Sequence, residues 1–217
     1  MQIQCNGVTL FVRTAGRKSA PALLLIHGNG EDHTIFDEAA QALEERYFVI
    51  MPDSRGHGAS QPVTRYSYRE MARDMAALLE ALDVQNVTVF GFSDGGIIAL
   101  LMAIWHPQRM QRLIAAGANT HPLGVAFSCV WDVARGYLQT RDGKLLLMLT
   151  QPWITRAQLS RIRIPARILA GEHDLIRPAH TRRMARAIPG AQVHFVQGED
   201  HGSYIVHSVR FIEEAQL

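Results

Sequence analysis

The chain has 217 residues, of which 47% are apolar and 19% are charged, and its formal net charge at pH 7 is +2. This composition is typical of a soluble globular protein, and the length suits one sizeable core better than two. We therefore expect a single domain over residues 1–217. The longest apolar run, Gly95 to Trp105, is too short to cross a bilayer, so no membrane partner is expected.

The first residues, the cysteines and the charge distribution argue against a secreted, disulfide-rich, zinc-binding or nucleic-acid-binding protein. The first ten residues mix polar and apolar side chains, unlike a secretory leader, which favours a cytoplasmic location. Cys5 and Cys129 are the only cysteines and are far apart, so neither a disulfide framework nor a zinc site is expected. Arg182, Arg183 and Arg186 form a local basic cluster that fits a solvated helix face better than a nucleic-acid site.

Apolar runs that end in turn-forming residues alternate with helical patterns along the chain. We expect an opening hairpin over residues 2–14, followed by strands at 22–26, 47–51, 87–90, 113–116, 166–170 and 193–196. Helices are expected at 34–46, 68–82, 97–105, 178–188 and 203–214. This alternation predicts an α/β fold with a mostly parallel sheet and helices on both of its faces.

The alternation breaks between residues 120 and 160, where helical but irregular segments carry Trp131, Tyr137 and Trp153. We expect this segment to form a short cap insertion over the edge of the sheet. Trp131 and Trp153 are candidate substrate contacts. For any one of these aromatic residues, packing of the cap onto the body is the more common role.

Residues 91–96, with the sequence GFSDGG, lie between a β-branched and aromatic strand and a long apolar helix. In this context the G-x-S-x-G pattern places its serine, Ser93, on a strained turn at the carboxyl edge of a sheet. Gly91 and Gly95 lack the Cβ atoms that would clash where strand and helix approach closely. Taken alone, the pattern fits a glycine-rich turn with a capping serine equally well.

Two further residues suggest how Ser93 would be activated. Asp174 and His201 each follow a late strand, so the order along the chain is Ser, Asp, His. A serine hydroxyl needs a base, and an imidazole serves best when a carboxylate orients it. All three residues follow strands at the edge where open α/β sheets bind ligands. Glu172 and Asp200 are competing carboxylates, and Asp174 is favoured over both.

Two other loops at this edge have polar and glycine-rich sequences. Residues 27–30, HGNG, place glycines on either side of Asn29, which could turn backbone N–H groups inward as one arm of an oxyanion hole or form an ordinary turn. Gly28 is a candidate substrate contact. In residues 53–60, DSRGHGAS, we expect an architectural loop held by an internal Asp–Arg ion pair and backbone hydrogen bonds.

These stretches together resemble the landmarks of the α/β-hydrolase superfamily, in the right order and over nearly the whole chain. The matching segments are residues 27–30, 53–60, 91–96, 171–178 and 200–202. The resemblance implies that Ser93 is the nucleophile, His201 the general base and Asp174 the orienting acid. It also implies an oxyanion hole formed by the backbone N–H groups of Asn29 and Asp94.

Within the superfamily, GFSDGGI at 91–97 followed by ANT at 118–120 is similar to the valacyclovir hydrolase (biphenyl hydrolase-like) group, esterases that cleave α-amino-acid esters. Asp94 is the distinctive residue. Its carboxylate could pair with a substrate ammonium, or it could simply complement the positive end of the helix dipole. The cap is shorter here than in that group, which leaves the size of the substrate open.

We therefore expect a serine hydrolase that cleaves carboxylic esters of small molecules through an acyl-enzyme, with small or amino-acid esters as candidates. Two alternatives stay open: a carbon–carbon bond hydrolase with the same fold and triad, and a low-turnover ligand-binding protein of this fold. No cofactor and no metal is expected, since no paired metal-ligand spacing occurs. The oligomeric state and the mobility of the cap are not predicted.

Overall fold

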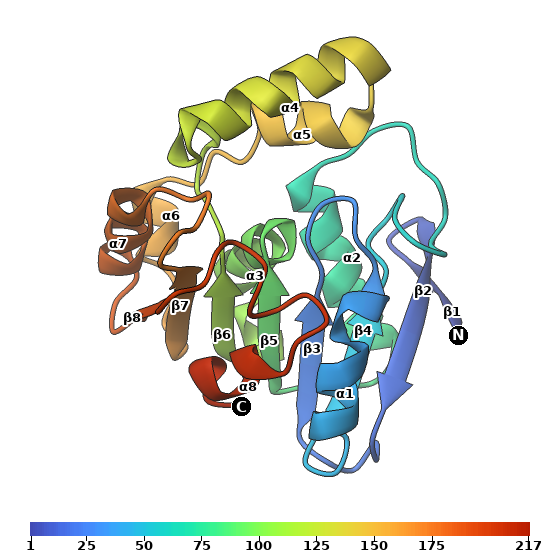
Figure 1. The fold of residues 1–217 in the computed structure, drawn as a ribbon. Coiled ribbons are helices and arrows are strands. Elements are labelled where there is room, and N and C mark those ends of the chain that lie inside the picture. The colour runs from blue at the N-terminus through green and yellow to red at the C-terminus, as the bar shows by residue number, and fades with distance from the viewer.

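A mixed sheet of eight strands forms the centre of the protein in the computed structural model, which describes residues 1–217 (Figure 1). The strands are β1 (Gln2–Cys5), β2 (Val8–Ala15), β3 (Ala22–Ile26), β4 (Phe48–Pro52), β5 (Val87–Phe92), β6 (Met110–Ala116), β7 (Ala166–Gly171) and β8 (Gln192–Val196). Their order across the sheet is β1-β2-β4-β3-β5-β6-β7-β8. Only β1 and β2 pair antiparallel to their neighbours, so the opening hairpin and the mostly parallel sheet are confirmed.

Helices cover both faces of this sheet, which confirms the predicted fold class. They are α1 (Asp37–Leu43), α2 (Tyr68–Ala81), α3 (Asp94–Trp105), α4 (Phe127–Thr140), α5 (Gly143–Thr150), α6 (Arg156–Leu159), α7 (Pro178–Ala187) and α8 (Arg210–Ala215). Helices α2, α3, α6 and α7 pack into the larger apolar core on one face. Helices α1 and α8 pack into a smaller core on the other face.

Strand β3 shows why the central strands are continuous apolar runs. All of its residues are buried, and they alternate between the two cores. Leu24 and Ile26 belong to the larger core, whereas Leu23 and Leu25 belong to the smaller one. A strand with helices on both sides has no solvent face, so polar residues have no place in it.

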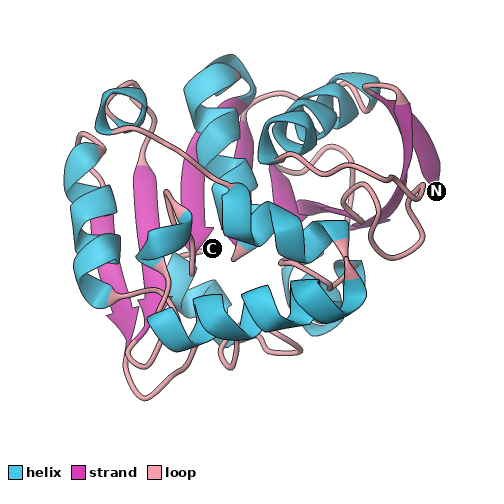
Figure 2. Ribbon diagram, turned by 90° about the horizontal axis from the view of Figure 1, so that it is seen from above, coloured by secondary structure: helices cyan, strands magenta, loops and turns pink.

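The cap helices α4 and α5 lie above the carboxyl ends of the strands (Figure 1). The view from above shows them crossing over these strand ends (Figure 2). Helix α4 has no buried residue and exposes Phe127, Trp131 and Leu138. Helix α6 also belongs to the segment 120–160, but it packs against α7 and its Leu159 joins the larger core.

The end of the chain differs from the sequence-based expectation. A helix was expected over 203–214, but α8 begins only at Arg210. Tyr204 and Ile205 are buried in the smaller core within turns, and His207 has a φ of 50°, which a helix cannot accommodate. The apolar residues of this segment are therefore buried in a turn and do not form a helix.

No helix in the structure is both long and apolar enough to pass through a bilayer.

The loop over residues 53–60 is held by side-chain contacts other than the expected ion pair. Arg55 donates two hydrogen bonds to Asp74 on α2, from Nε at 2.6 Å and Nη2 at 2.5 Å, and Asp53 pairs with His33. The expected pair between Asp53 and Arg55 is therefore wrong. Burial raises the pKa of Asp74 and outweighs the opposing effect of its hydrogen bonds with Arg55 and Asn6. The pair joins the loop to α2.

Loss of the buried pair between Arg55 and Asp74 should destabilise the folded protein. We expect Arg55→Met to lower the free energy of unfolding by about 3 kcal/mol, because Asp74 would stay buried with Asn6 as its remaining hydrogen-bond donor. Arg73→Met is the matched control on α2, since its pair with Glu70 has both side chains more than a third exposed. It should cost at most about 0.5 kcal/mol. Urea unfolding measures both values, and equal losses would contradict the assignment.

Candidate active site

Ser93 lies at the junction of β5 and α3 with φ 53° and ψ −116°, a backbone conformation that few non-glycine residues adopt. The neighbouring glycines make this possible. A Cβ at Gly91 would lie 2.1 Å from the carbonyl oxygen of Gly95, and one at Gly95 would lie 2.1 Å from that of Ile26. The strained turn predicted from the sequence is confirmed.

The structure brings Ser93, His201 and Asp174 into one hydrogen-bonded line. The Oγ of Ser93 lies 3.0 Å from Nε2 of His201, and Nδ1 of His201 lies 2.7 Å from Oδ1 of Asp174. These residues follow β5, β8 and β7, and the parallel pairing of β7 with β8 places two of the loops side by side. Residues more than a hundred positions apart thus meet at one edge of the sheet.

The carboxylate of Asp174 is fully buried and held by backbone donors. Its Oδ2 accepts from the N–H of Gly171 at 3.1 Å, and its Oδ1 accepts from the N–H of Ile176 at 2.8 Å. A carboxylate fixed in this way favours the His201 tautomer that carries its proton on Nδ1. Nε2 is then free to accept the Ser93 proton.

The competing carboxylates have other partners. Glu172 accepts a hydrogen bond from the N–H of Gly198 at 2.9 Å. Asp200 accepts from the N–H groups of Gly202 and Ser203, both at 2.9 Å, which lowers the pKa of Asp200. Asp200 therefore shapes the turn that carries His201, without a hydrogen bond to the ring.

The two backbone donors of the expected oxyanion hole have no acceptor in the structure. Neither the N–H of Asn29 nor that of Asp94, the first residue of α3, donates a hydrogen bond within the protein. Gly28 packs against the nucleophile, since a Cβ there would lie 3.1 Å from the Cβ of Ser93. Its N–H is already occupied by Oε2 of Glu31 at 2.8 Å. The free N–H of Asp94, at the N-terminus of α3, suits a developing negative charge.

Asp94 is buried beside the nucleophile and has neutral partners. Its Oδ1 accepts from the hydroxyl of Tyr68 at 2.6 Å, and its Oδ2 accepts from the side-chain amide of Asn29 at 2.8 Å. No lysine or arginine pairs with it. Burial, opposed by these hydrogen bonds, raises the pKa of Asp94. The site therefore holds a desolvated carboxylate that lacks a cation.

The sequence did not reveal Tyr68 or Glu31 as part of this site. Tyr68 is buried at the start of α2, and nothing in its local pattern separates it from a core aromatic residue. Glu31 follows the HGNG loop, and burial raises the pKa of its carboxyl group. An acidic residue directly after a glycine-rich turn was the one available signal.

Ser93 and His201 line a narrow cavity of about 40 Å³ under the cap. The other residues of its wall are Tyr68, Asp94, Asn119, Val125, Cys129, Met148, Gln151, Leu175 and Ile176. This volume is well below the roughly 300–1,000 Å³ of a typical small-molecule site, so little free space lies beside Ser93 in this structure.

The two cap tryptophans lie away from this cavity. Trp131 and Trp153 are each 65% exposed. Trp131 belongs to the solvent face of α4, which buries none of its residues. The indole of Trp153 donates to the carbonyl of Thr150 and stacks on His121. Neither residue lines this cavity, and their contact with a substrate stays a prediction.

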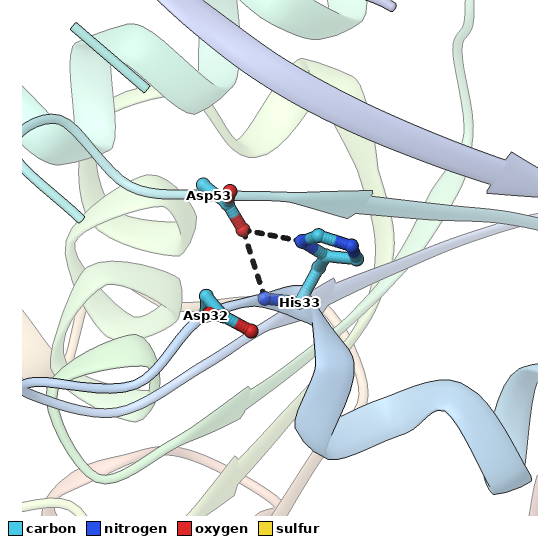
Figure 3. A group of neighbouring side chains, drawn as sticks. All are labelled: Asp32, His33 and Asp53. Carbon is cyan, nitrogen blue, oxygen red and sulfur yellow. Dashed lines mark hydrogen bonds and ion pairs between the residues drawn. The ribbon is translucent and has the colours of Figure 1, made fainter. Parts of the chain in front are cut away.

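Asp32, His33 and Asp53 form a separate cluster whose side chains point toward one another (Figure 3). Their candidate ligand atoms lie within 4.8 Å of one another, the spacing of a possible metal site. Asp53 accepts hydrogen bonds from His33 and from the N–H of Ala59, and Asp32 accepts from Thr34. Because these oxygens already have donors, we assign the cluster a structural role in joining the 53–60 loop to His33.

Comparisons with known proteins agree with this geometry. The alpha/beta hydrolase fold family matches residues 21–141, more than half of the chain. The human serine hydrolase BPHL is 26% identical over 98% of this chain and 82% of its own length. Uncharacterized protein Rv2715 of Mycobacterium tuberculosis is 28% identical over 96% of this chain and 77% of its own. The resemblance to the biphenyl hydrolase-like group is thus confirmed.

Solved structures show the same fold. A hydrolase from Pseudomonas aeruginosa is 25% identical, with a TM-score of 0.77 over 94% of this chain and 92% of that one. A thermophilic esterase from Thermogutta terrifontis is 20% identical, with a TM-score of 0.83 over 100% of this chain and 97% of that one. At this lower identity the likeness concerns the fold alone.

The close packing of Gly117 against His201 can be tested. An added Cβ at Gly117, where φ is +59°, would lie 2.7 Å from Cε1 of the ring and push it from Ser93. We expect Gly117→Ala to slow labelling of Ser93 by a fluorophosphonate about tenfold to a hundredfold. Gly190→Ala is the control, because Gly190 has a similar φ of +72° and open space around it.

Both glycine variants should lose about 1–2 kcal/mol of stability from left-handed backbone strain, measured by urea unfolding. Only Gly117→Ala should change the labelling rate. If the two variants were labelled at the same rate, contact between residue 117 and the His201 ring would not control the geometry at Ser93.

Proposed function

This chain belongs to the α/β-hydrolase family, and on that premise we propose that it is a serine hydrolase that cleaves carboxylic esters. The hydrogen-bonded line from Ser93 through His201 to Asp174 carries the proposal. A hydroxyl, an imidazole and a buried carboxylate in this order form a nucleophile, a base and the group that orients the base. Hydrolase activity is also the function named for several of the relatives.

In the first half of the proposed reaction, the Oγ of Ser93 attacks the ester carbonyl carbon while its proton passes to Nε2 of His201. The carbonyl oxygen becomes an anion, which the N–H groups of Asn29 and Asp94 would stabilise. The tetrahedral intermediate then collapses, the bond to the leaving oxygen breaks, and His201 returns the proton to the departing alcohol. Ser93 is left as an acyl ester.

Water completes the cycle. His201 takes a proton from the water as its oxygen attacks the acyl carbon, and the same backbone donors would hold the second oxyanion. When this intermediate collapses, the proton on His201 passes to Oγ of Ser93. The products are a carboxylic acid and the regenerated enzyme, so the step needs no redox partner.

Asp94 supports a preference for amino-acid esters. Its carboxylate lines the same cavity as Ser93 and receives hydrogen bonds from two neutral donors. A buried carboxylate gains much from a cation, and the α-ammonium of an amino-acid ester lies next to the scissile carbonyl. Asp94 also begins α3, where it complements the helix dipole, but that role does not require a buried side chain.

Replacement of the nucleophile is the most direct test. Ser93→Ala should lower p-nitrophenyl acetate hydrolysis at least about 10⁴-fold, since loss of the nucleophile removes the acylation step. Ser67→Ala is the control, because the Ser67 side chain makes no capping hydrogen bond at the start of α2. It should hydrolyse the ester like the wild type. Equal turnover by Ser93→Ala and the wild type would remove Ser93 from the mechanism.

Selectivity for the substrate amine tests the role of Asp94. For the wild type, kcat/KM for a phenylalanine ester should exceed that for its N-acetyl derivative. Asp94→Asn should reduce this ratio about tenfold to a hundredfold, the value of an ion pair worth about 1–3 kcal/mol. The N-acetyl ester serves as the internal control for damage to the triad. An unchanged ratio would leave Asp94 with the helix-dipole role alone.

A further inference from the structure

A second cavity, of about 360 Å³, lies between α6 and α7 and reaches the loop after β6. It is lined by Thr120, His121, Ile154, Arg156, Leu159, His180, Arg183, Met184, Arg186 and Ala187. None of these residues lines the cavity around Ser93. Its volume falls within the range of small-molecule sites, roughly 300–1,000 Å³. It is therefore a separate candidate site.

The charged side chains around this cavity are all positive. Arg156, Arg183 and Arg186 line it, and no aspartate or glutamate does. None of the three guanidinium groups donates a hydrogen bond or lies within ion-pair distance of a carboxylate, whereas Arg55 and Arg210 are paired. Two of these arginines belong to the cluster that the sequence placed on a solvated helix face. Guanidinium groups without acceptors are suited to bind phosphate or carboxylate.

Two imidazoles in the wall each have one ring nitrogen without a hydrogen-bond partner in the protein. His180 is only 5% exposed, and its Nε2 accepts the N–H of Thr120 at 3.0 Å, so the neutral ring carries its proton on Nδ1. That N–H has no acceptor in the protein. Nδ1 of His121 is buried and has no hydrogen bond. A buried polar atom such as this one is rarely left unsatisfied, and a ligand in the cavity would supply its missing partner.

The lowered pKa of His180 agrees with a neutral ring that donates from Nδ1. Burial, followed by the nearby His121, Arg177 and Arg183, lowers the pKa of His180 to about 4. The ring is therefore neutral at pH 7 and can donate from Nδ1 without adding a buried charge. The positive charge of the site comes from the arginines, which are exposed to solvent on α6 and α7.

Apart from Thr120, the remaining wall is apolar. Ile154, Leu159 and Met184 are buried and belong to the larger core. From this combination we propose that the cavity binds a small organic anion in which a phosphate or carboxylate group is joined to an apolar body. The arginines and imidazoles would contact the anionic group, and the core side chains would contact the body.

The site is independent of the proposed ester hydrolysis, although the two cavities are neighbours. Asn119 lines the Ser93 cavity, and the next residue, Thr120, lines the second one. The side-chain amide of Asn119 donates to the carbonyl of His121 at 3.0 Å. Binding at the second cavity can therefore be measured in a protein that has lost Ser93.

Isothermal titration calorimetry with phenylphosphonate and with hexanoate tests the proposal and separates the two headgroups. At least one of these anions should bind with one-to-one stoichiometry. Arg183→Gln and Arg156→Gln should each weaken that binding about tenfold, as expected for loss of one charge-assisted contact. Arg17→Gln is the charge-matched control on the exposed turn after β2, and it should bind like the wild type. Ser93→Ala should also bind like the wild type.

Two further ligands and one spectrum complete the test. Inorganic phosphate lacks the apolar body and benzyl alcohol lacks the charge, so each should bind at least about tenfold more weakly than the organic anion. In the ¹H–¹⁵N spectrum, the amides of Thr120 and His121 should shift on binding. The proposal is overturned if neither anion binds saturably, or if the arginine variants bind like the wild type. Equal binding of inorganic phosphate, or shifts confined to residues around Ser93, would also overturn it.

Discussion

The close approach of β5 and α3 is the constraint on which the rest of the site depends. Ser93 occupies a conformation that costs energy, and the absence of side chains at Gly91 and Gly95 allows the backbone to come so close. The structure can hold this strain because α3 is buried on nearly all sides in the larger core. Hydrophobic burial along α3 therefore stabilises the geometry that presents the hydroxyl.

The order of the strands brings Ser93 together with the other residues of the site. β5, β6, β7 and β8 are consecutive neighbours, so the loops at their carboxyl ends converge on one edge. The loops after β7 and β8 touch, since a Cβ at Gly171 would lie 2.1 Å from the carbonyl oxygen of Asp200. This contact sets the distance between Asp174 and His201. Parallel strands thus align groups that the sequence keeps far apart.

Local chemistry explains which features could be predicted from the sequence. The buried strands, the glycine turn at Ser93 and the positions of Asp174 and His201 all follow from patterns within short segments. Side-chain partners do not. Arg55 binds Asp74 rather than its neighbour Asp53, and Tyr68 meets Asp94, because tertiary packing brings distant helices to these loops. Likewise, no local pattern shows on which side of α4 an aromatic residue lies, which is why the exposure of Trp131 was not foreseen.

The two cavities have opposite electrostatic character, and this contrast bears on how the proposed activities would coexist. Near Ser93 the acidic groups are Asp94 and Glu31, neither of which pairs with a lysine or arginine, and burial raises the pKa of each. The cavity between α6 and α7 offers arginines without acceptors. A carboxylic acid released by ester hydrolysis ionises at neutral pH, so it belongs to the class of anion that the cavity between α6 and α7 is proposed to bind. Asn119 and Thr120 are consecutive residues, so the loop after β6 contributes to the walls of both cavities while the anion-binding groups stay on α6 and α7.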